Sequence, residues 1–349
     1  MLIIIGFLAG AFLLSPICKN QKYKNLYLIL IWASLVFITA FRSYSYYTDT
    51  VGYYHSYTFN ANRDLSVLFS NVINGEGKDP FYHFCSALFS HAGLDFRVWL
   101  IAVSSVYYGG FVYVVKRFSN LPFISVFGLV ALSYVFFTMT GIRQTIAMGF
   151  TFFAFVKAYD KKLIPFLLFI IAGWAFHSSA LIFLLVYPLM HRRIGLLQVA
   201  LLVVAMGMAV LFPGAINTIV RELAWNEDLA NYANVTTGLS IFGYVIQLLL
   251  AGGSILIAHE YCFTSKEGVA LINMAVLGLV FQSFVINIDN IFRLSMYFSV
   301  YGVVLVGNAL SKLNDRNTYY VFYTIVCVAF VSYMIYNRAF ANFTMFGGI

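Results

Sequence analysis

The sequence predicts an all-α protein, a polytopic integral membrane protein of about twelve transmembrane helices. Of its 349 residues, 62% are hydrophobic and only 10% are charged, whereas roughly 25% are charged in an ordinary soluble domain. The mean hydropathy is +0.86. Uncharged stretches of helix length recur along the whole chain, and no long polar block separates them. We therefore expect one integral membrane domain over residues 1–349.

The order of the spans follows from where Lys and Arg gather, because short cytoplasmic loops carry the excess of both. The first two spans enclose Lys19, Lys22 and Lys24, so that loop is expected inside. Two long loops, 42–96 and 213–238, are then expected outside. The spans expected in chain order are 2–18, 26–41, 97–115, 121–140, 144–158, the two short arms 163–176 and 178–190, 194–212, 239–258, 269–286, 294–310 and 319–336.

The basic residues of the expected outer face are almost all arginine, with Lys78 as the single lysine. A topology signal alone would not exclude lysine from one face. A site that binds two phosphate oxygens at once, by contrast, favours arginine, because its planar guanidinium group can donate to both. The outer face is therefore predicted to hold an anion. The arginines are Arg42, Arg63, Arg97, Arg143, Arg221, Arg293 and Arg338.

Tyrosines crowd the first outer loop in the stretch YSYYTDTVGYYHSYTF, residues 44–59. These aromatic side chains are expected either in a belt at the membrane interface or in a platform for sugars. Later in the same loop, residues 80–96 form an amphipathic stretch that is too polar for a span. This stretch is expected to lie on the membrane surface or to enter it partly.

One histidine interrupts the membrane-like run AGWAFHSSALIFLL, residues 172–185. The helical arms before and after His177 each reach about 20 Å at 1.5 Å per residue, but the hydrocarbon core is about 30 Å thick. We therefore expect a re-entrant hairpin, or a thinned bilayer, with His177 in a sheltered pocket near the outer leaflet. A structural hydrogen bond at the turn is the alternative.

Two arginines also stand in membrane-like surroundings. Arg143 precedes another short arm, and ionisable groups at such depth mark functional sites by default. Arg293 lies four residues after Asp289, so the two are expected either in the site or in a salt bridge on the surface of a helix. Arginines suit the neutralisation of a diphosphate leaving group, and a carboxylate or imidazole suits a general base. This chemistry favours glycosyl transfer from a lipid diphosphate.

Other functions are disfavoured by composition. Nucleic-acid binding is not expected despite a net charge of +8, because the basic residues are dispersed between hydrophobic spans. The four cysteines have no CxxC spacing, and no HExxH, P-loop or dinucleotide motif occurs in its required context. We expect no metal and no cofactor, and the lipid bilayer is an expected partner.

An ordered set of short motifs resembles the EpsG family of Wzy-type polysaccharide polymerases over about residues 40–300. Two positions depart from the family: Tyr47 stands where glycine commonly precedes Thr-Asp, and Asp79 stands where a glutamate usually precedes proline. Asp79 keeps a carboxylate on a shorter side chain. The motifs are Arg42 with Thr48-Asp49-Thr50 and Tyr53-Tyr54, Asp79-Pro80-Phe81, Arg143-Gln144-x-x-Ala147, Phe176-His177-Ser178-Ser179-Ala180-Leu181-Ile182, and Arg293-x-x-x-Tyr297.

This resemblance implies a C-type, membrane-embedded glycosyltransferase fold with no nucleotide sugar and no obligatory metal. The growing glycan on undecaprenyl diphosphate would be transferred, with inversion, to the non-reducing end of a lipid-linked repeat unit. The reaction would occur at the outer, periplasmic face of the bacterial inner membrane. Partners implied are these lipid-linked glycans and, as a further candidate, a chain-length regulator.

The predicted site divides into three roles. Arg143, Arg293 and Arg42 are predicted to bind the diphosphate. His177 or Asp49 is predicted to deprotonate the acceptor hydroxyl, with His177 favoured because its ordinary pKa needs little adjustment at neutral pH. The residues predicted to contact the acceptor sugars are Asp49, Tyr54, Asp79, Gln144 and Tyr297.

Two alternatives remain open. An O-antigen ligase of the same superfamily would move finished glycan to another acceptor, and a flippase or transporter for lipid-linked glycans would also need a cationic cavity. Transporters commonly contain internal inverted repeats, and the sequence contains no convincing repeat. A membrane acyltransferase is less favoured, because FHSSAL has no acidic partner beside its histidine.

Overall fold

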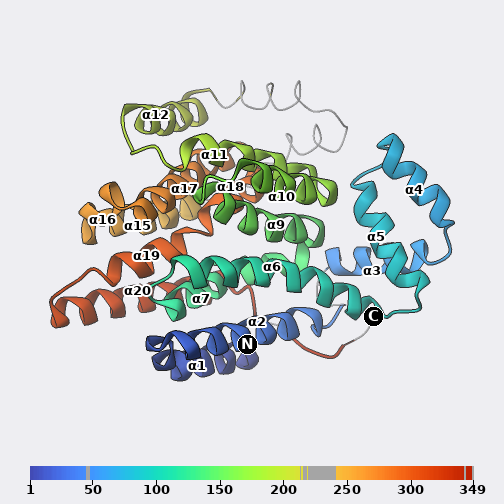
Figure 1. Cartoon of the computed structure of the whole chain (residues 1–349), viewed down its shortest axis with the longest axis horizontal. Coiled ribbons are helices and arrows are strands. Elements are labelled where there is room, and N and C mark those ends of the chain that lie inside the picture. The colour runs from blue at the N-terminus through green and yellow to red at the C-terminus, as the bar shows by residue number, and fades with distance from the viewer. Residues whose placement is uncertain (45–47, 213, 215–217, 219–240, 342, 348–349) are drawn as a thin grey trace. The chain divides into compact units, whose positions relative to one another are not determined.

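The computed structural model is all-helical over the part of the chain that it describes, residues 1–44, 48–212, 214, 218, 241–341 and 343–347 (Figure 1). The described residues form no named strand, and the isolated bridge between Arg42 and Met345 is the one β-type pairing recorded among them. The predicted all-α class is confirmed. The outer loop predicted over 213–238 falls outside the described residues, apart from 214 and 218.

The chain divides into two compact units, Met1–Phe118 with Val126–Leu184 and Cys327–Ile349, and Ser119–Ser125 with Leu185–Val326. The single integral domain expected from the sequence stays a prediction. The helices in chain order are α1 (Leu2–Leu14), α2 (Gln21–Ala40), α3 (Thr48–Asn60), α4 (Leu65–Asn74), α5 (Pro80–His91), α6 (Phe96–Phe118), α7 (Pro122–Ala131), α8 (Tyr134–Thr140), α9 (Ile142–Tyr159), α10 (Leu163–Phe176), α11 (Val186–Leu189), α12 (Leu196–Leu211), α15 (Ile241–Ile257), α16 (His259–Thr264), α17 (Lys266–Ser283), α18 (Phe292–Ser299), α19 (Gly302–Leu310) and α20 (Arg316–Asn337). The 3₁₀ segments are η1 (Ser15–Lys19), η2 (Ser178–Leu185), η3 (Phe284–Ile286) and η4 (Asp289–Ile291).

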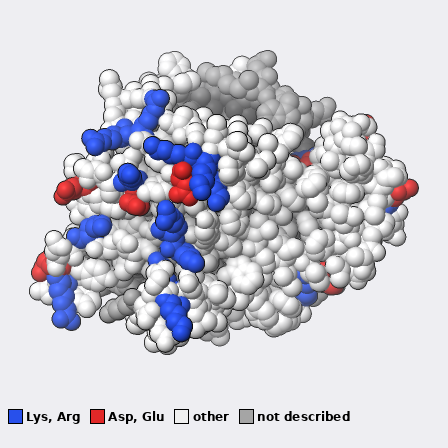
Figure 2. All heavy atoms as spheres, viewed as in Figure 1, with Lys and Arg blue, Asp and Glu red and all other residues white. Residues whose placement is uncertain are grey.

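Five of the described helical segments are long and apolar enough to cross a membrane. The pair α7 and α8, bent by 51°, makes up to six if it counts as one span. Exposed apolar side chains cover several helices, for example Leu168 at 61% exposure and Leu196 at 86%, and charged side chains are few over much of the face in Figure 2. The chain is therefore a membrane protein by composition and helix length. The expected count of about twelve spans stays a prediction, since the other apolar helices have only 10–17 residues.

The segment 42–96, predicted as a long loop, contains three helices, α3, α4 and α5, which lie together at one end of the first unit (Figure 1). The signals for α4 are local. The Asp64 side chain accepts a hydrogen bond from the backbone N–H of Ser66, and Gly75 ends the helix at φ 68°. Pro80 begins α5 at a position where its missing N–H costs nothing. Hydropathy did not predict α3, which is polar, or α4, which is apolar but has only 10 residues, whereas α5 lies in the amphipathic stretch expected over 80–96.

The helices α2, α6, α9 and α10 lie side by side in the first unit (Figure 1). Glycines let their backbones approach closely. A Cβ on Gly110 would meet the Gly149 carbonyl oxygen at 2.6 Å, and one on Gly149 would meet the Tyr107 backbone at 2.9 Å. A Cβ on Gly173 would lie 3.1 Å from the Ala147 carbonyl oxygen. Small residues at helix contacts are the usual means of tight packing in a membrane.

The two ends of this helix group differ in charge. At one end, Lys24 Nζ donates to the Lys116 carbonyl over 3.3 Å, and Arg117 pairs with Asp160 at 3.5 Å. These contacts bring together the start of α2 and the ends of α6 and α9. Because α2 runs opposite to α6 and α9, the first residues of α6 and α9 lie at the other end, with the last residues of α2. Lys24, which is expected inside, thus shares one end of the first unit with Lys116 and Arg117.

Replacing Gly149 by valine should destabilise the protein, because the new side chain has no space against the α6 backbone. Overpacking of this kind costs about 1–3 kcal/mol or more, so the apparent melting temperature of the purified protein should fall by several degrees. The matched control is Gly6→Val in α1, where no described heavy atom lies within 4 Å of the new Cβ. Equal melting temperatures for the two variants would contradict the close packing.

Candidate functional site

Three side chains from distant parts of the chain meet in the first unit: Asp79, Arg143 and His177. Asp79 Oδ2 lies 3.1 Å from Arg143 Nη1 and 3.0 Å from His177 Nδ1. The exposed fraction of the side chain is 8% for Asp79, 19% for Arg143 and 22% for His177. A nearly buried carboxylate thus contacts a guanidinium and an imidazole that both remain partly accessible. We call these three residues the Asp79 cluster.

Asp79 reaches this position from a short loop before α5. Its backbone is left-handed, with φ 52° and ψ 55°, and it occupies the N-cap position that Pro80 follows. Aspartate is among the few residues enriched in this region of backbone space. The carboxylate does not cap its own helix, since it accepts no hydrogen bond from a backbone N–H of α5. Strained backbone of this kind is often found at functional sites.

His177 lies at the break that the sequence predicted. The helix α10 ends at Phe176, and His177 adopts an extended backbone with φ −162° before the 3₁₀ segment η2 begins. Its backbone N–H donates to the Gly173 carbonyl and its carbonyl accepts from Ala180, so the break keeps its backbone hydrogen bonds. The predicted interruption at His177 is confirmed, while its depth in a membrane stays a prediction.

Arg143 stands in the first turn of α9, directly after the break between α8 and α9 at Gly141. Its Cζ atom lies 5.7 Å from the centre of the Tyr53 ring, which is within the range of a cation–π contact. Arg143 Nε is buried and has no hydrogen-bond partner among the described residues. The guanidinium therefore has donors beyond the one that Asp79 uses.

Aromatic rings form one wall beside the Asp79 cluster. The Phe176 ring stacks on Phe150 with centres 5.9 Å apart, and it meets Phe81 edge-on at 5.0 Å. These three side chains belong to α10, α9 and α5, so they connect the elements that carry His177, Arg143 and Asp79. Apolar surroundings strengthen charge pairs by lowering the local dielectric constant.

The Asp79 carboxyl group is held in its ionised form. Burial alone would raise its pKa, but the hydrogen bond with His177 and the positive charges of His177, Arg143 and Lys78 together outweigh burial and lower the pKa from 3.8. At neutral pH the carboxylate is therefore an acceptor for both neighbours. The carboxylate can orient His177 and hold positive charge near it.

The other predicted site residues are not part of the Asp79 cluster. Asp49 lies exposed in the first turn of α3, and Tyr54 stacks on Tyr44 with ring centres 5.4 Å apart. Gln144 is buried in α9. Arg293 and the buried Tyr297 belong to α18 of the second unit, so their predicted roles stay predictions. The Asp289 side chain, proposed as a partner of Arg293, is not among the described side chains.

Arg42 is fully buried, whereas the sequence predicts that it binds the diphosphate. Its guanidinium donates to the carbonyls of Thr39 and Met139 and to Thr50 Oγ1, with distances of 2.8 Å to Met139 and 3.2 Å to Thr50. It thereby joins the end of α2, the start of α3 and the end of α8. This geometry favours a structural role, because a side chain surrounded by backbone carbonyls has little access to a ligand.

Sequence reasoning named Tyr53 in a motif but gave it no role, and it missed the pairing of Asp79 with His177. The helical spacing of α3 offered a signal for the first, because Tyr53 follows Asp49 by one turn and differs in direction from Tyr54. No local signal existed for the second, since Asp79 and His177 are separated by 98 positions. Among the described residues, no group of three or more His, Cys, Asp and Glu side chains is arranged to hold a metal ion. The expected independence from metal stays a prediction.

Replacing Asp79 by asparagine should destabilise the protein in a pH-dependent way. Removing one partner of a buried ion pair costs about 3–5 kcal/mol, and less here because Arg143 and His177 keep access to solvent. The depressed pKa of Asp79 stabilises the folded state fully above about 3.8, the usual pKa, and the stabilisation is lost as pH falls through the lower folded value. Melting curves between pH 7 and pH 3 should therefore separate wild type from Asp79→Asn at neutral pH and bring them together in acid. A gap that persists unchanged to pH 3 would argue against an ionised, paired Asp79.

Replacing Arg42 by lysine should also lower stability, although the charge is kept. A single ammonium group lacks the planar fork that reaches three acceptors, and each lost hydrogen bond to a charged donor costs about 1.5–3 kcal/mol. Arg63→Lys is the control, because Arg63 is only half-buried. The measurement is the apparent melting temperature, and equal values for the two variants would refute the structural role of Arg42.

The comparisons with known proteins agree with the motifs. The family model described as the EpsG family matches residues 25–346, nearly the whole chain. No curated protein and no solved structure matches the chain. The predicted C-type glycosyltransferase-like fold therefore stays a prediction, whereas the family match supports a polysaccharide polymerase-like function in general. The chain belongs to the EpsG family, a family of Wzy-type polymerase-like proteins.

Proposed function

We propose that this chain is a membrane glycosyltransferase that polymerises lipid-linked oligosaccharide repeat units. It transfers the growing glycan from undecaprenyl diphosphate to the non-reducing end of a new repeat unit, with inversion at the transferred carbon. The observation that carries the proposal is the Asp79 cluster, which places an oriented histidine beside an arginine in a member of the EpsG family. These two side chains match the two tasks of the reaction.

His177 is the proposed general base. Because an ionised carboxylate only accepts, its contact with Nδ1 places the proton on Nδ1 and leaves the lone pair on Nε2. The same arrangement orients the histidine in carboxylate–histidine catalytic sites and stabilises the imidazolium that forms. Asp79 is thus a positioning residue for His177, a role that differs from the contact with acceptor sugars predicted from the sequence. Among the described residues, Asp49, the other predicted base, makes no comparable contact with a second side chain.

Arg143 is the proposed stabiliser of the leaving group. One of its nitrogens pairs with Asp79, and 19% of the side chain stays exposed. A guanidinium can therefore bind diphosphate oxygens without giving up its contact with the carboxylate. Fixed positive charge near the departing diphosphate lowers the barrier because negative charge develops there in the transition state.

The proposed step balances as a single displacement. The acceptor hydroxyl oxygen forms a bond to the anomeric carbon of the donor glycan, while the bond from that carbon to the diphosphate oxygen breaks. The hydroxyl proton moves to His177 Nε2, and the bonding electron pair leaves with undecaprenyl diphosphate. Asp79 balances the imidazolium charge until the proton returns to solvent. Attack opposite the leaving group inverts the anomeric centre.

Sidedness is inferred from the first unit alone. The contacts of Lys24 with Lys116 and of Arg117 with Asp160 lie at one end of the α2, α6 and α9 group. The Asp79 cluster lies at the other end, since Arg143 begins α9. By the positive-inside rule, the end rich in Lys and Arg is cytoplasmic. The proposed reaction therefore takes place at the outer face of the inner membrane.

The direct test supplies purified protein in lipid nanodiscs with a purified undecaprenyl-diphosphate-linked repeat unit and no nucleotide sugar. The expected products contain two or more repeat units on one carrier lipid. Deleting the gene should leave single repeat units attached to the final acceptor, whereas loss of a ligase would leave long chains on the carrier. A failure to extend the repeat unit, together with its movement across the membrane of sealed proteoliposomes, would favour a transporter instead.

Conservative substitutions should separate the roles within the Asp79 cluster. Asp79→Glu should retain much of the polymerising activity because it keeps a carboxylate, whereas Asp79→Asn should lose about 10²-fold or more, in line with general-base catalysis. Arg143→Lys should also lose activity, because a single ammonium cannot bind diphosphate and Asp79 together. Chain-length distributions from equal amounts of membrane-inserted protein give the measurement. Full activity in both Asp79→Asn and Arg143→Lys would exclude the proposed centre.

A further inference from the structure

A cavity of about 300 Å³ lies among α3, α4 and α5, next to the Asp79 cluster and apart from the roles assigned so far. Its lining mixes one aromatic ring and two aliphatic side chains with amide, hydroxyl, imidazole and charged groups. Pockets of this size with convergent polar groups are typical of small-ligand sites. The residues that line it are Ser56, Phe59, Asn60, Arg63, Leu68, Asn71, Glu76, Gly77, Lys78, Pro80 and His83.

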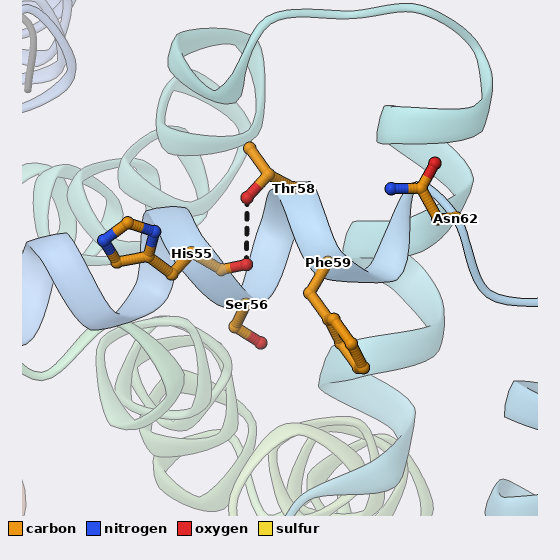
Figure 3. A pocket seen from close by; sticks show the side chains of 5 residues that line it. All are labelled: His55, Ser56, Thr58, Phe59 and Asn62. Carbon is orange, nitrogen blue, oxygen red and sulfur yellow. Dashed lines mark hydrogen bonds between the residues drawn. The ribbon is translucent and has the colours of Figure 1, made fainter.

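Phe59 joins this cavity to a second, more open hollow of about 690 Å³ on α3, lined by residues 55, 56, 58, 59 and 62. In Figure 3, the side chains of Ser56 and Phe59 project from the same side of α3. The exposed fraction of Phe59 is 66%. An exposed ring at the junction of two polar hollows offers a flat apolar face, which suits the C–H face of a pyranose ring.

The polar groups of the cavity are arranged for hydroxyl recognition. Asn60 Nδ2 and Ser56 Oγ both lie 3.3 Å from His83 Nδ1. Because the amide nitrogen only donates, Nδ1 accepts and the proton of the neutral ring lies on Nε2. Burial and the positive charge of Arg143 lower the pKa of His83 from 6.5, which keeps the ring neutral at pH 7. Nε2–H is thus the hydrogen-bond donor that the His83 ring has left.

Charged side chains complete the rim. Arg63 and Lys78 contribute hydrogen-bond donors, and Glu76 contributes hydrogen-bond acceptors. When the Asn71 amide is oriented with its nitrogen toward Glu76, that nitrogen lies 3.3 Å from Oε2. The cavity therefore offers both hydrogen-bond donors and hydrogen-bond acceptors. These match the hydroxyl groups of a sugar, each of which donates one hydrogen bond and accepts others.

The cavity adjoins the proposed reaction centre. Lys78 and Pro80 line it and flank Asp79 in the chain, and the backbone N–H of His83 lies 3.4 Å from the Asp79 carbonyl oxygen. A sugar bound in the cavity would therefore lie close to the segment that positions His177. An oligosaccharide that continues past Phe59 would occupy the second hollow.

We propose that these two hollows, joined at Phe59, bind pyranose rings of the lipid-linked repeat unit and so select the glycan that is polymerised. The inference rests on the proposed function, but it concerns recognition of the sugars rather than of the diphosphate. It adds Phe59, Asn60, Arg63 and His83 to the residues with a role in substrate selection. The carrier lipid and its phosphates take no part in this contact.

The test measures binding of the repeat-unit oligosaccharide after mild acid has released it from its lipid diphosphate. Saturation-transfer NMR and calorimetry with the full-length protein in nanodiscs should detect binding to wild type. Phe59→Ala should weaken it about three- to tenfold, as expected for loss of one aromatic contact, and Arg63→Ala should also weaken it. Phe69→Ala is the matched control: Phe69 lies on α4, is 50% exposed and does not line either hollow.

Two outcomes would overturn the inference. One is a released oligosaccharide that does not bind wild type, and the other is equal affinity for wild type, Phe59→Ala and Phe69→Ala. Failure of the proposed function gives a different result: no polymer forms with wild-type protein, while sugar binding that depends on Phe59 persists. Failure of the inference alone leaves polymerisation by Phe59→Ala unchanged in both kcat and KM, whereas the inference predicts a raised KM.

Discussion

The structure of the candidate site depends on one carboxylate that satisfies two cationic or polar partners at once. Asp79 is almost buried, so its charge is tolerated only because Arg143 and His177 both contact the same oxygen. A buried ion pair of this kind adds little net stability compared with an apolar core. Its value lies in geometry, because it fixes which nitrogen of His177 is protonated and where Arg143 can reach.

That geometry is supported by packing and by a second arginine. Glycines bring the backbones of α6, α9 and α10 close enough for Arg143 and His177 to converge on a loop from another part of the chain. Arg42 joins three helix ends just before the break at Gly141. The C-terminal segment contributes as well, since the backbone N–H of Ser43 donates to the carbonyl of Thr344. Residues far from the chemistry thus hold the cluster in place.

Much of the fold was readable in the sequence, but the site only in part. Hydropathy placed nearly every helix outside 42–96, and it located the break at His177 because the two arms were too short for the bilayer. It did not find α3, whose sequence is polar, or α4, which is apolar but has only 10 residues, whereas the amphipathic stretch expected over 80–96 contains α5. A count of membrane crossings needs helix length, and several apolar helices have fewer residues than a crossing requires.

The site residues that the sequence predicted are those with a local signal, and the contacts that it missed join distant parts of the chain. Arg143 and His177 were found because ionisable groups among apolar residues are costly and need a reason. The pairing of His177 with Asp79 is a contact across 98 positions, which one sequence does not encode locally. Arg42 belonged with Arg143 to the arginines expected at the outer face, yet the structure surrounds it with backbone carbonyls. Hydropathy identifies a buried charge without telling whether its partner is the protein or a ligand.

The breaks in the helices connect these observations. Where a helix ends inside a membrane-embedded protein, backbone N–H and C=O groups are freed and need hydrogen-bond partners. Near the break at Gly141, the Met139 carbonyl accepts from both Arg42 and Thr50, so polar side chains must gather wherever the helix stops. Once gathered, they create a local polar environment in an apolar protein, and Arg143 and His177 stand beside two such breaks. The interruptions of the helices are therefore the same features that allow a charged, partly accessible site to exist among them.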